Sequence, residues 1–401
     1  MRDGLAAPCL AGRHCRAVRR CACASLFWRN LKVKRFLIAS ASAAAVTACA
    51  LVLAAAAIRS EQGKPAVVKP APRDEAGIYG QRLAGVRLGT PVQHRGLEVY
   101  PLLGGSQAPF YDTLDSALKK GSLVIEELSR VNEARVTNKG SRPVLILDGE
   151  QIVGAKQNRV FNSSLLAPPG ESLTAKVSCV EHGRWSGVSV RFEASGLQLF
   201  ARARQANQAA VARNMASAGA PLSDQAGIWA DVAAKNRALD VRADTDAMQR
   251  AFEAKAADVS EYVERIRPVP GQVGAIFAVH GDIVGLDLFD SEKTLKEIYP
   301  KLIKSYALDA ISPLPPRGAS TLGGDRKSAE EFLDAAAKAD GTAYPSQGEG
   351  KDLRVSGWQI TGSALVARGR VVHAAVFAGE GSSEKPDDSA TSIAPPGVRR
   401  R

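Results

Sequence analysis

Apolar and polar positions alternate along much of residues 86–193, and this pattern predicts a β-rich first half. The alternation is strict over 173–179, so four apolar side chains share one strand face and three polar side chains share the other. Pro168-Pro169-Gly170 must form a turn before this strand, because proline fixes φ and supplies no ladder donor. One short helix is expected over 111–120, with Asp112 or Thr113 as its N-cap. We predict a β-meander that folds on itself or into a sandwich.

The second half changes to helical spacing and then returns to strands. Alanine-rich segments with a 3.6-residue period predict helices, and a further helix over 291–311 should kink or break at Pro300. Hairpins are expected around His280-Gly281-Asp282 and around Arg368-Gly369. The strands and helices come in blocks and do not alternate, which favours an α+β fold in which a helical block is inserted before C-terminal hairpins. The expected helices are 201–218, 225–239 and 246–267.

Both ends of the chain lack the pattern of a folded domain. Residues 36–58 carry no charge and are long enough to cross a bilayer, and basic residues precede them, so a single-pass anchor should place the following domain outside the cytoplasm. A cleaved signal, which gives a secreted or periplasmic protein, and lipidation at Cys49 are alternatives. The expected organisation is a basic, Cys-rich leader or overlong start at 1–35, the membrane segment at 36–58, a linker at 59–84, one domain at 85–378 and a disordered tail at 379–401.

The net charge of +12 belongs mostly to the N-terminus. Residues 1–60 contribute +9 of it, which leaves +3 for the rest of the chain. The folded part therefore shows no basic stripe, and we expect no nucleic-acid partner. Five of the six cysteines precede the folded part, so Cys179 has no partner for an internal disulfide.

Residues 149–185, called the signature segment below, concentrate unusual polar residues between apolar runs. Lys156, Arg159 and Arg184 could hold phosphate or carboxylate, and Gln157 and Asn158 could read an amide or a base edge. Trp185 could stack on a ring. This set predicts a binding site for a small anionic, nucleotide-like ligand. The alternative is a buried network in which Glu150 or Glu181 pairs with one of the arginines.

Other chemistries have weaker support. A strand would place Cys179 and Glu181 on one face and His182 on the other, and the chain has no CxxC pair or HExxH motif, so we expect no metal. A Cys179 nucleophile would need a histidine beside it, and a buried strand cysteine is the simpler interpretation. Phosphate loops and dinucleotide fingerprints are missing from the sequence, so no cofactor is expected. Glu150 and Glu181 are the candidate catalytic acids or bases if the protein is an enzyme.

The strings GEQIVGAKQNRVFNSS and VSCVEHGRW resemble the signature of the ARG and rhodanese-phosphatase-superfamily-associated protein domain. GQVGAIFAVHGDIVGLDLFD and GSALVARGRVVHAAVF are similar to its C-terminal part, so the resemblance covers about residues 85–377. The family has Gln at the position of His182, which argues against His182 as an obligatory ligand or base. Its name implies association with ADP-ribosylglycohydrolase and rhodanese or phosphatase proteins, which makes ADP-ribose-like ligands attractive candidates.

Three functions follow from these observations. The first is an exported or membrane-anchored module that binds a small anionic ligand or a partner protein. The second is a hydrolase or transferase that acts on a nucleotide- or ADP-ribose-like substrate. The third is a structural envelope protein without a ligand. An enzyme requires a carboxylate of shifted pKa beside a cleft, a binding module requires the cleft alone, and a structural protein requires neither.

Overall fold

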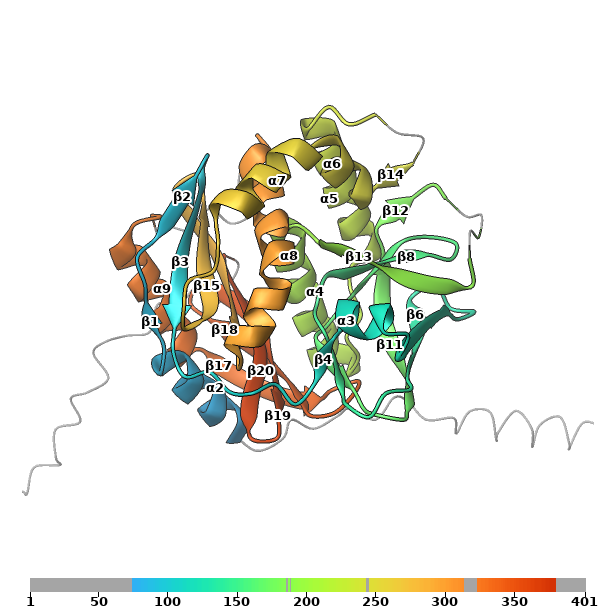
Figure 1. Cartoon of the computed structure of the whole chain (residues 1–401), viewed down its shortest axis with the longest axis horizontal. Coiled ribbons are helices and arrows are strands. Elements are labelled where there is room, and N and C mark those ends of the chain that lie inside the picture. The colour runs from blue at the N-terminus through green and yellow to red at the C-terminus, as the bar shows by residue number, and fades with distance from the viewer. Residues whose placement is uncertain (1–73, 185–186, 188, 243–244, 314–322, 380–401) are drawn as a thin grey trace, which may run out of the picture. The chain divides into compact units, whose positions relative to one another are not determined.

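A computed structural model describes residues 74–379 apart from 185–186, 188, 243–244 and 314–322 (Figure 1). The predicted leader, membrane segment and first part of the linker lie outside the described residues, and so does the tail after Gly379. Among the described residues, no helix combines the length and the apolar character needed to cross a membrane. The described part contains both helices and antiparallel sheets in separate blocks, which confirms the predicted α+β class.

A nine-stranded sheet joins the first strands of the domain to the last ones. Its order is β1-β3-β15-β16-β20-β19-β18-β17, with β2 paired to β3. The strands are β1 (Arg87–Leu88), β2 (Val92–His94), β3 (Leu97–Leu103), β15 (Gln272–Val279), β16 (Asp282–Phe289), β17 (Asp340–Pro345), β18 (Lys351–Gly357), β19 (Ile360–Ala367) and β20 (Arg370–Ala378). Both predicted hairpins are confirmed, because His280-Gly281 and Arg368-Gly369 have the positive φ angles that such turns need.

Helices cover both faces of this sheet. On one face, α2 (Asp74–Ala84) packs against α9 (Arg326–Lys338), and Tyr79 donates a hydrogen bond to the Ala336 carbonyl at 3.0 Å. The prediction of a linker over 59–84 is therefore wrong for the α2 residues, because Tyr79 and Leu83, one turn apart, are fully buried in the core. On the other face, α8 (Glu292–Ile311) stacks Tyr306 on Phe277 at 3.8 Å.

The middle of the sequence forms a closed six-stranded barrel in the order β11-β6-β5-β13-β8-β9. Fully buried apolar side chains such as Ile125, Ile152 and Phe161 fill it. The strands are β5 (Leu123–Glu127), β6 (Glu133–Asn138), β8 (Glu150–Gly154), β9 (Arg159–Phe161), β11 (Ser172–Cys179) and β13 (Arg191–Gln198). The prediction of a single meander over 86–193 is wrong for β1–β3, because β3 pairs with β15 in the nine-stranded sheet. Most of the strands that follow do fold on themselves, as this closed barrel.

A small sheet and one short helix lie beside the barrel. The sheet has the order β10 (Leu165–Ala167), β7 (Val144–Ile146) and β4 (Asp112–Thr113), and α3 (Leu114–Lys119) follows β4. Thr113 caps α3 by accepting a hydrogen bond from the Ser116 N–H, as its position in the sequence predicts. Asp148-Gly149 turns the chain from this sheet into the barrel and closes no hairpin between β7 and β8. The Pro168-Pro169-Gly170 turn likewise connects two different sheets.

The inserted helical block contains α4 (Ala201–Ala218), α5 (Gln225–Ala238), α6 (Met248–Ala254) and α7 (Ala256–Arg265), with β12 (Glu181–His182) and β14 (Asp246–Ala247) paired beside it. The helix expected over 246–267 is divided at Lys255. By contrast, α8 continues through Pro300, so the predicted break does not occur. Pro300 is exposed, and water can therefore reach the carbonyl group that its missing N–H leaves free. α8 lies between the large sheet and the barrel (Figure 1).

Candidate functional site

Arg159 of the signature segment forms an ion pair with Glu127 inside the protein. Its side chain is fully buried, with Nη2 2.5 Å from Glu127 Oε1 and Nη1 3.6 Å from Cys179 Sγ. The guanidinium also lies over the Phe192 ring at 5.8 Å from its centre. These contacts balance the charge of Arg159 inside the protein. An incoming anion would have to displace Glu127.

Arg184, near the end of the signature segment, reaches residues 155 and 158 near its start. Its Nη2 lies 2.6 Å from Glu181 Oε2 and 3.2 Å from Asn158 Oδ1, and its Nη1 donates to the Ala155 carbonyl at 2.8 Å. Burial alone would raise the pKa of Glu181. The hydrogen bonds from Arg184 and from the Asn158 N–H hold that pKa below its usual range. A lowered pKa keeps Glu181 ionised and is unfavourable for a general acid at neutral pH.

The remaining ligand-binding candidates differ in their surroundings. Lys156 is exposed, with Nζ 3.9 Å from Glu127 Oε2. Gln157 is fully buried, and neither polar atom of its amide has a hydrogen-bond partner within the described residues. Trp185 lies outside the described residues. Lys156 is therefore the one candidate cation of the segment whose side chain reaches solvent freely.

Glu150 faces α8, away from Glu181 and its partners. Its carboxylate lies 2.5 Å from Lys301 Nζ and accepts a hydrogen bond from the Leu147 N–H at 2.7 Å. Lys301 also lies 2.9 Å from Asp115 Oδ2. Burial raises the pKa of Glu150, although the Lys301 charge opposes this effect. Lys301 thus lies between two carboxylates, the buried Glu150 and the more exposed Asp115.

A larger group of buried charges, which was not predicted from the sequence, lies between the barrel and the nine-stranded sheet. Arg204 of α4 donates to Asp287 of β16 at 2.8 and 3.1 Å and to Asp148 at 3.3 and 3.5 Å. His373 of β20 lies between Asp287 and Ser164. All five side chains are at most 6% exposed. We call Asp148, Ser164, Arg204, Asp287 and His373 the central ion cluster.

The pKa shifts in the central ion cluster show how strongly its charges interact. Burial alone would raise the pKa of Asp287 and of Asp148. The Arg204 guanidinium, assisted by His373, instead holds both values below their usual range. Gly149 makes this packing possible, because it adopts φ +75° and a Cβ there would lie 3.1 Å from Arg204 Cγ. In the Asp-Gly-Glu sequence at 148–150, Asp148 pairs with Arg204, Gly149 allows the close approach of Arg204, and Glu150 pairs with Lys301.

Three members of this cluster have the residue types of a hydrolase triad. Ser164 Oγ lies 2.9 Å from His373 Nδ1, and His373 Nε2 lies 3.2 Å from Asp287 Oδ1. However, Arg204 occupies both oxygens of Asp287, and Ser164 Oγ also accepts the Asp148 N–H at 3.0 Å. Burial of the serine leaves a substrate no approach to it. We therefore assign the cluster to the attachment of the barrel to the sheet.

A cavity of about 550 Å³ opens on the barrel where β5 and β13 stop pairing. These strands pair only at Glu126 with Arg191 and at Ile125 with Phe192, and the next residues of both strands line the cavity. We call it the barrel cavity. Its cationic lining residues are Lys119, Lys139 and Arg191, its carboxylates are Asp115 and Glu193, and its apolar lining residues include Leu123, Val124, Ile125, Phe192 and Ala194.

The cations of the barrel cavity differ from those of the signature segment. Lys119, Lys139 and Arg191 are exposed, and Arg191 has only a loose contact of 3.7 Å with Glu126. Neither lysine forms an ion pair within the described part of the chain. The sequence does not single out these residues, because single lysines and arginines at the ends of strands are common on any protein surface. Their charges are available to a ligand.

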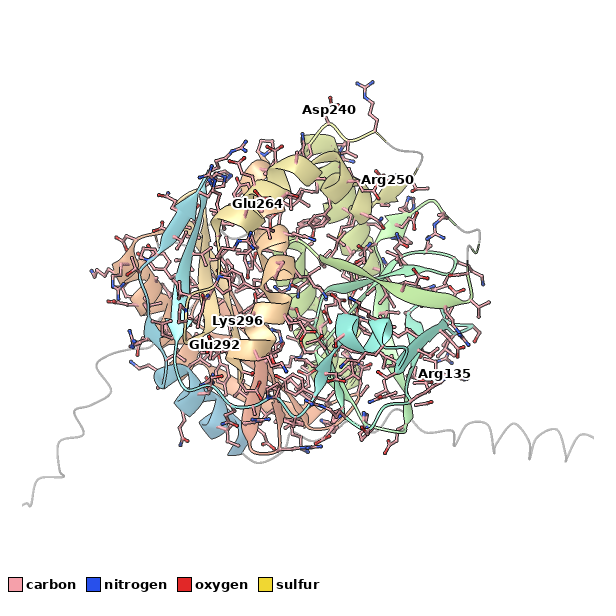
Figure 2. The ribbon with its side chains drawn as sticks, in the orientation of Figure 1. Arg135, Asp240, Arg250, Glu264, Glu292 and Lys296 are labelled. Carbon is pink, nitrogen blue, oxygen red and sulfur yellow. The ribbon has the colours of Figure 1, made fainter. Side chains whose placement is uncertain are left out.

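Two further cavities lie elsewhere. One of about 600 Å³ is lined by Arg142, Lys293 and Lys296 together with loop residues 106–109 and Glu292. Glu292 and Lys296 pair at 2.6 Å at the start of α8 (Figure 2), which neutralises part of its charge. The other, of about 100 Å³, lies between α4 and α5. In the described residues, no three His, Cys, Asp or Glu side chains gather as a metal site.

The model of the ARG and Rhodanese-Phosphatase-superfamily-associated Protein domain matches residues 85–377. The chain belongs to this family. The match spans the barrel, the helical block and nearly all of the nine-stranded sheet, so the family domain includes both the signature segment and the barrel cavity. No curated protein and no solved structure matches the chain. The family match covers most of the described residues. It does not identify an activity, which has to be inferred from the geometry of the site.

Proposed function

We propose that this family domain is a binding module for a small anionic ligand of nucleotide or ADP-ribose type, and that the ligand occupies the barrel cavity. The observation that carries the proposal is the combination of three exposed cations with an apolar wall in a cavity of about 550 Å³. This volume lies within the range of small-molecule sites. Arg191 and Lys139 can hold phosphate groups, and the apolar wall can receive a base or a sugar face.

The signature segment supports this function indirectly. Its two arginines are neutralised by Glu127 and Glu181, so a phosphate placed there would compete with carboxylates that already have short contacts. Because the segment contributes β8 and β9 to the barrel, it fixes the walls that surround the cavity. The ligand-binding residues in this proposal are Lys119, Lys139 and Arg191. Asn158, Arg159 and Arg184 act as supports of the barrel, and Lys156 and Gln157 have no role in this proposal.

The screen that tests the proposal is a thermal-shift assay of the purified protein against ADP-ribose, nucleotides, sugar phosphates and orthophosphate. A ligand at 100 times its dissociation constant adds about 2.7 kcal/mol of apparent stability. The double variant Lys139→Ala, Arg191→Ala should lose this shift while it keeps its own melting temperature, because both side chains are exposed. Lys293→Ala, Lys296→Ala is the matched control, since it removes two cations from another cavity. An equal shift in both variants would place the ligand elsewhere.

A second candidate function has one specific observation in its favour. Asp115 lines the barrel cavity, and its Oδ2 is linked through Lys301 to the buried Glu150. If the ligand is turned over, Asp115 is the carboxylate placed to exchange a proton with it, whereas Glu150 is enclosed. Hydrolase or transferase activity that survives in Asp115→Asn would refute this role. Activity lost with unchanged ligand affinity would support it.

The location of the domain is part of the proposal. The charge-free residues 36–58, preceded by Lys32, Lys34 and Arg35, support export with the domain outside the cytoplasm. A reporter enzyme that is active only outside the cytoplasm, fused after Gly379, should be active. Activity of a reporter that works only inside the cytoplasm would contradict export. An extracytoplasmic position would restrict the natural ligand to molecules found outside the cytoplasm.

A further inference from the structure

The cavity of about 100 Å³ between α4 and α5, called the helix cavity below, has a buried polar floor. Asn207, Asp231, Gln205 and Thr361 line it and are each at most 6% exposed. The Asn207 Oδ1 atom has no hydrogen-bond partner within the described residues. An unsatisfied buried carbonyl oxygen is costly, so this floor presents an acceptor to any donor that enters.

The charges around the helix cavity differ between its floor and its rim. Asp231 supplies a carboxylate at the buried end, and the exposed Arg213 and Asp224 stand at the open end. A simple anion would meet two carboxylates, and a simple cation would meet the Arg213 guanidinium. A molecule that carries both charges can place an ammonium group against Asn207 and Asp231 and a carboxylate toward Arg213. The lining therefore favours a zwitterion.

The size of the helix cavity restricts the zwitterion further. Several of its lining residues on α4 and α5 are small, namely Ala206, Ala209, Ala210 and Gly227, and Ile228 narrows it further. A volume of about 100 Å³ holds a molecule of a few heavy atoms. We propose that the helix cavity is a binding site for a small amino-acid zwitterion of the size of glycine or alanine. This site is separate from the barrel cavity and does not depend on the ligand proposed there.

Isothermal titration and thermal shift of the full chain with glycine and L-alanine test the proposal. Each amino acid at about 10 mM is tenfold above a dissociation constant of about 1 mM, a moderate value for so small a ligand. Its binding should raise the melting temperature by about 2 °C. Methylammonium, acetate and L-leucine are the comparison ligands, because two lack one charge and the third exceeds the cavity. A shift by glycine and alanine alone supports the proposal, and no shift, or an equal shift by leucine, overturns it.

Variants locate the binding. Asn207→Leu keeps the branched shape and the number of heavy atoms of the side chain, removes the unpartnered Oδ1 and should abolish the glycine response. Ala209→Leu, at a half-buried position on the wall, fills the same cavity and replaces this test if Asn207→Leu fails to fold. Arg213→Gln should weaken glycine binding about threefold, the contribution of an exposed ion pair. Arg135→Gln, at an exposed position on β6 of the barrel (Figure 2), is the control and should change nothing. Wild-type glycine binding in both Asn207→Leu and Ala209→Leu would overturn the assignment.

Discussion

Replacement of Arg204 by methionine should destabilise the protein more than a substitution at any exposed position of α4. The guanidinium donates four hydrogen bonds of 2.8–3.5 Å to Asp148 and Asp287, and all three side chains are buried. Methionine keeps most of the volume but leaves two carboxylates without their cation. The remaining bonds from Ser164 to Asp148 and from Tyr306 to Asp287 compensate only in part.

The magnitude follows from the cost of breaking a buried ion pair, about 3–5 kcal/mol. With a urea slope of about 3 kcal/mol per molar for a domain of this size, the midpoint should fall by about 1 M or more. The assay is urea unfolding at pH 7 followed by tryptophan fluorescence and circular dichroism. Arg213→Met on the same helix is the matched control, because Arg213 is exposed and should cost less than about 0.5 kcal/mol.

The pH dependence separates an ion pair from simple packing. In the native protein, the pKa values of Asp148 and Asp287 are held below those of the unfolded chain, largely by Arg204. Their contribution is therefore present above the unfolded pKa of about 4 and is lost as the pH falls through the lower folded values. In Arg204→Met these carboxylates lose that support, so the cost should be largest at pH 7 and smaller near pH 4. A loss below about 1 kcal/mol, or one independent of pH, would refute the assignment of the cluster as a paired structural centre.

Three further predictions follow from single positions. Gly149→Ala should lower the free energy of unfolding in urea by about 1–3 kcal/mol, because Gly149 has φ +75° and a Cβ would lie 3.1 Å from Arg204. In Gly105→Ala the new Cβ meets nothing within 4 Å, so this control should be neutral. Equal effects of the two substitutions would contradict this explanation. Gln157→Leu should be neutral or slightly stabilising by the same measurement, since both amide atoms are buried and unpartnered in the described part; a loss above about 2 kcal/mol would reveal a partner. Burial raises the pKa of the Cys179 thiol, so peptide mapping after iodoacetamide treatment should find Cys179 modified only in urea; rapid labelling of the native protein would show that it is accessible.

Local features of the fold were predictable because they depend on neighbouring residues. The Thr113 cap and the turns at His280-Gly281 and Arg368-Gly369 use side chains and φ angles within a few positions of each other. The pairing partner of each strand was harder to predict from the sequence. Alternation shows which side chains share a face, and it contains no information that β3 pairs with β15 far along the chain. The sequence therefore predicted one meander folded on itself or into a sandwich, and did not separate β1–β3 from the closed barrel.

The ion pairs show the same limit. Arg204 lies in an alanine-rich helix where an arginine ordinarily faces solvent, and its partners Asp148 and Asp287 are 56 and 83 residues away. A signal was available at Asp287 and His373, because each interrupts a strand whose other residues are almost all apolar. A charged residue buried on such a strand requires a partner. The sequence could indicate that partners exist, but only the fold identifies Arg204.

At the candidate site, the segment richest in unusual polar residues is not the segment that lines the cavity. The signature segment was the natural prediction for a ligand site, with a buried network as its alternative. The Glu181–Arg184 pair of that network is present, whereas Arg159 pairs with Glu127 and Glu150 pairs with Lys301. The cavity beside β5 and β13 arises from a loss of strand pairing, which no residue type marks. Its cations, Lys139 and Arg191, are ordinary surface residues in the sequence.

Hydrogen exchange measured by mass spectrometry with and without ADP-ribose tests the central claim most directly, because it locates the ligand on the chain. If the ligand occupies the barrel cavity, amide exchange should slow in the segments 119–125 and 191–194, which contain most of the residues that line that cavity. The segments 155–159 and 181–184 should exchange at the same rate in both conditions. Slower exchange confined to those signature residues would return the binding site to the buried arginines, and unchanged exchange throughout the chain would remove ADP-ribose as a ligand.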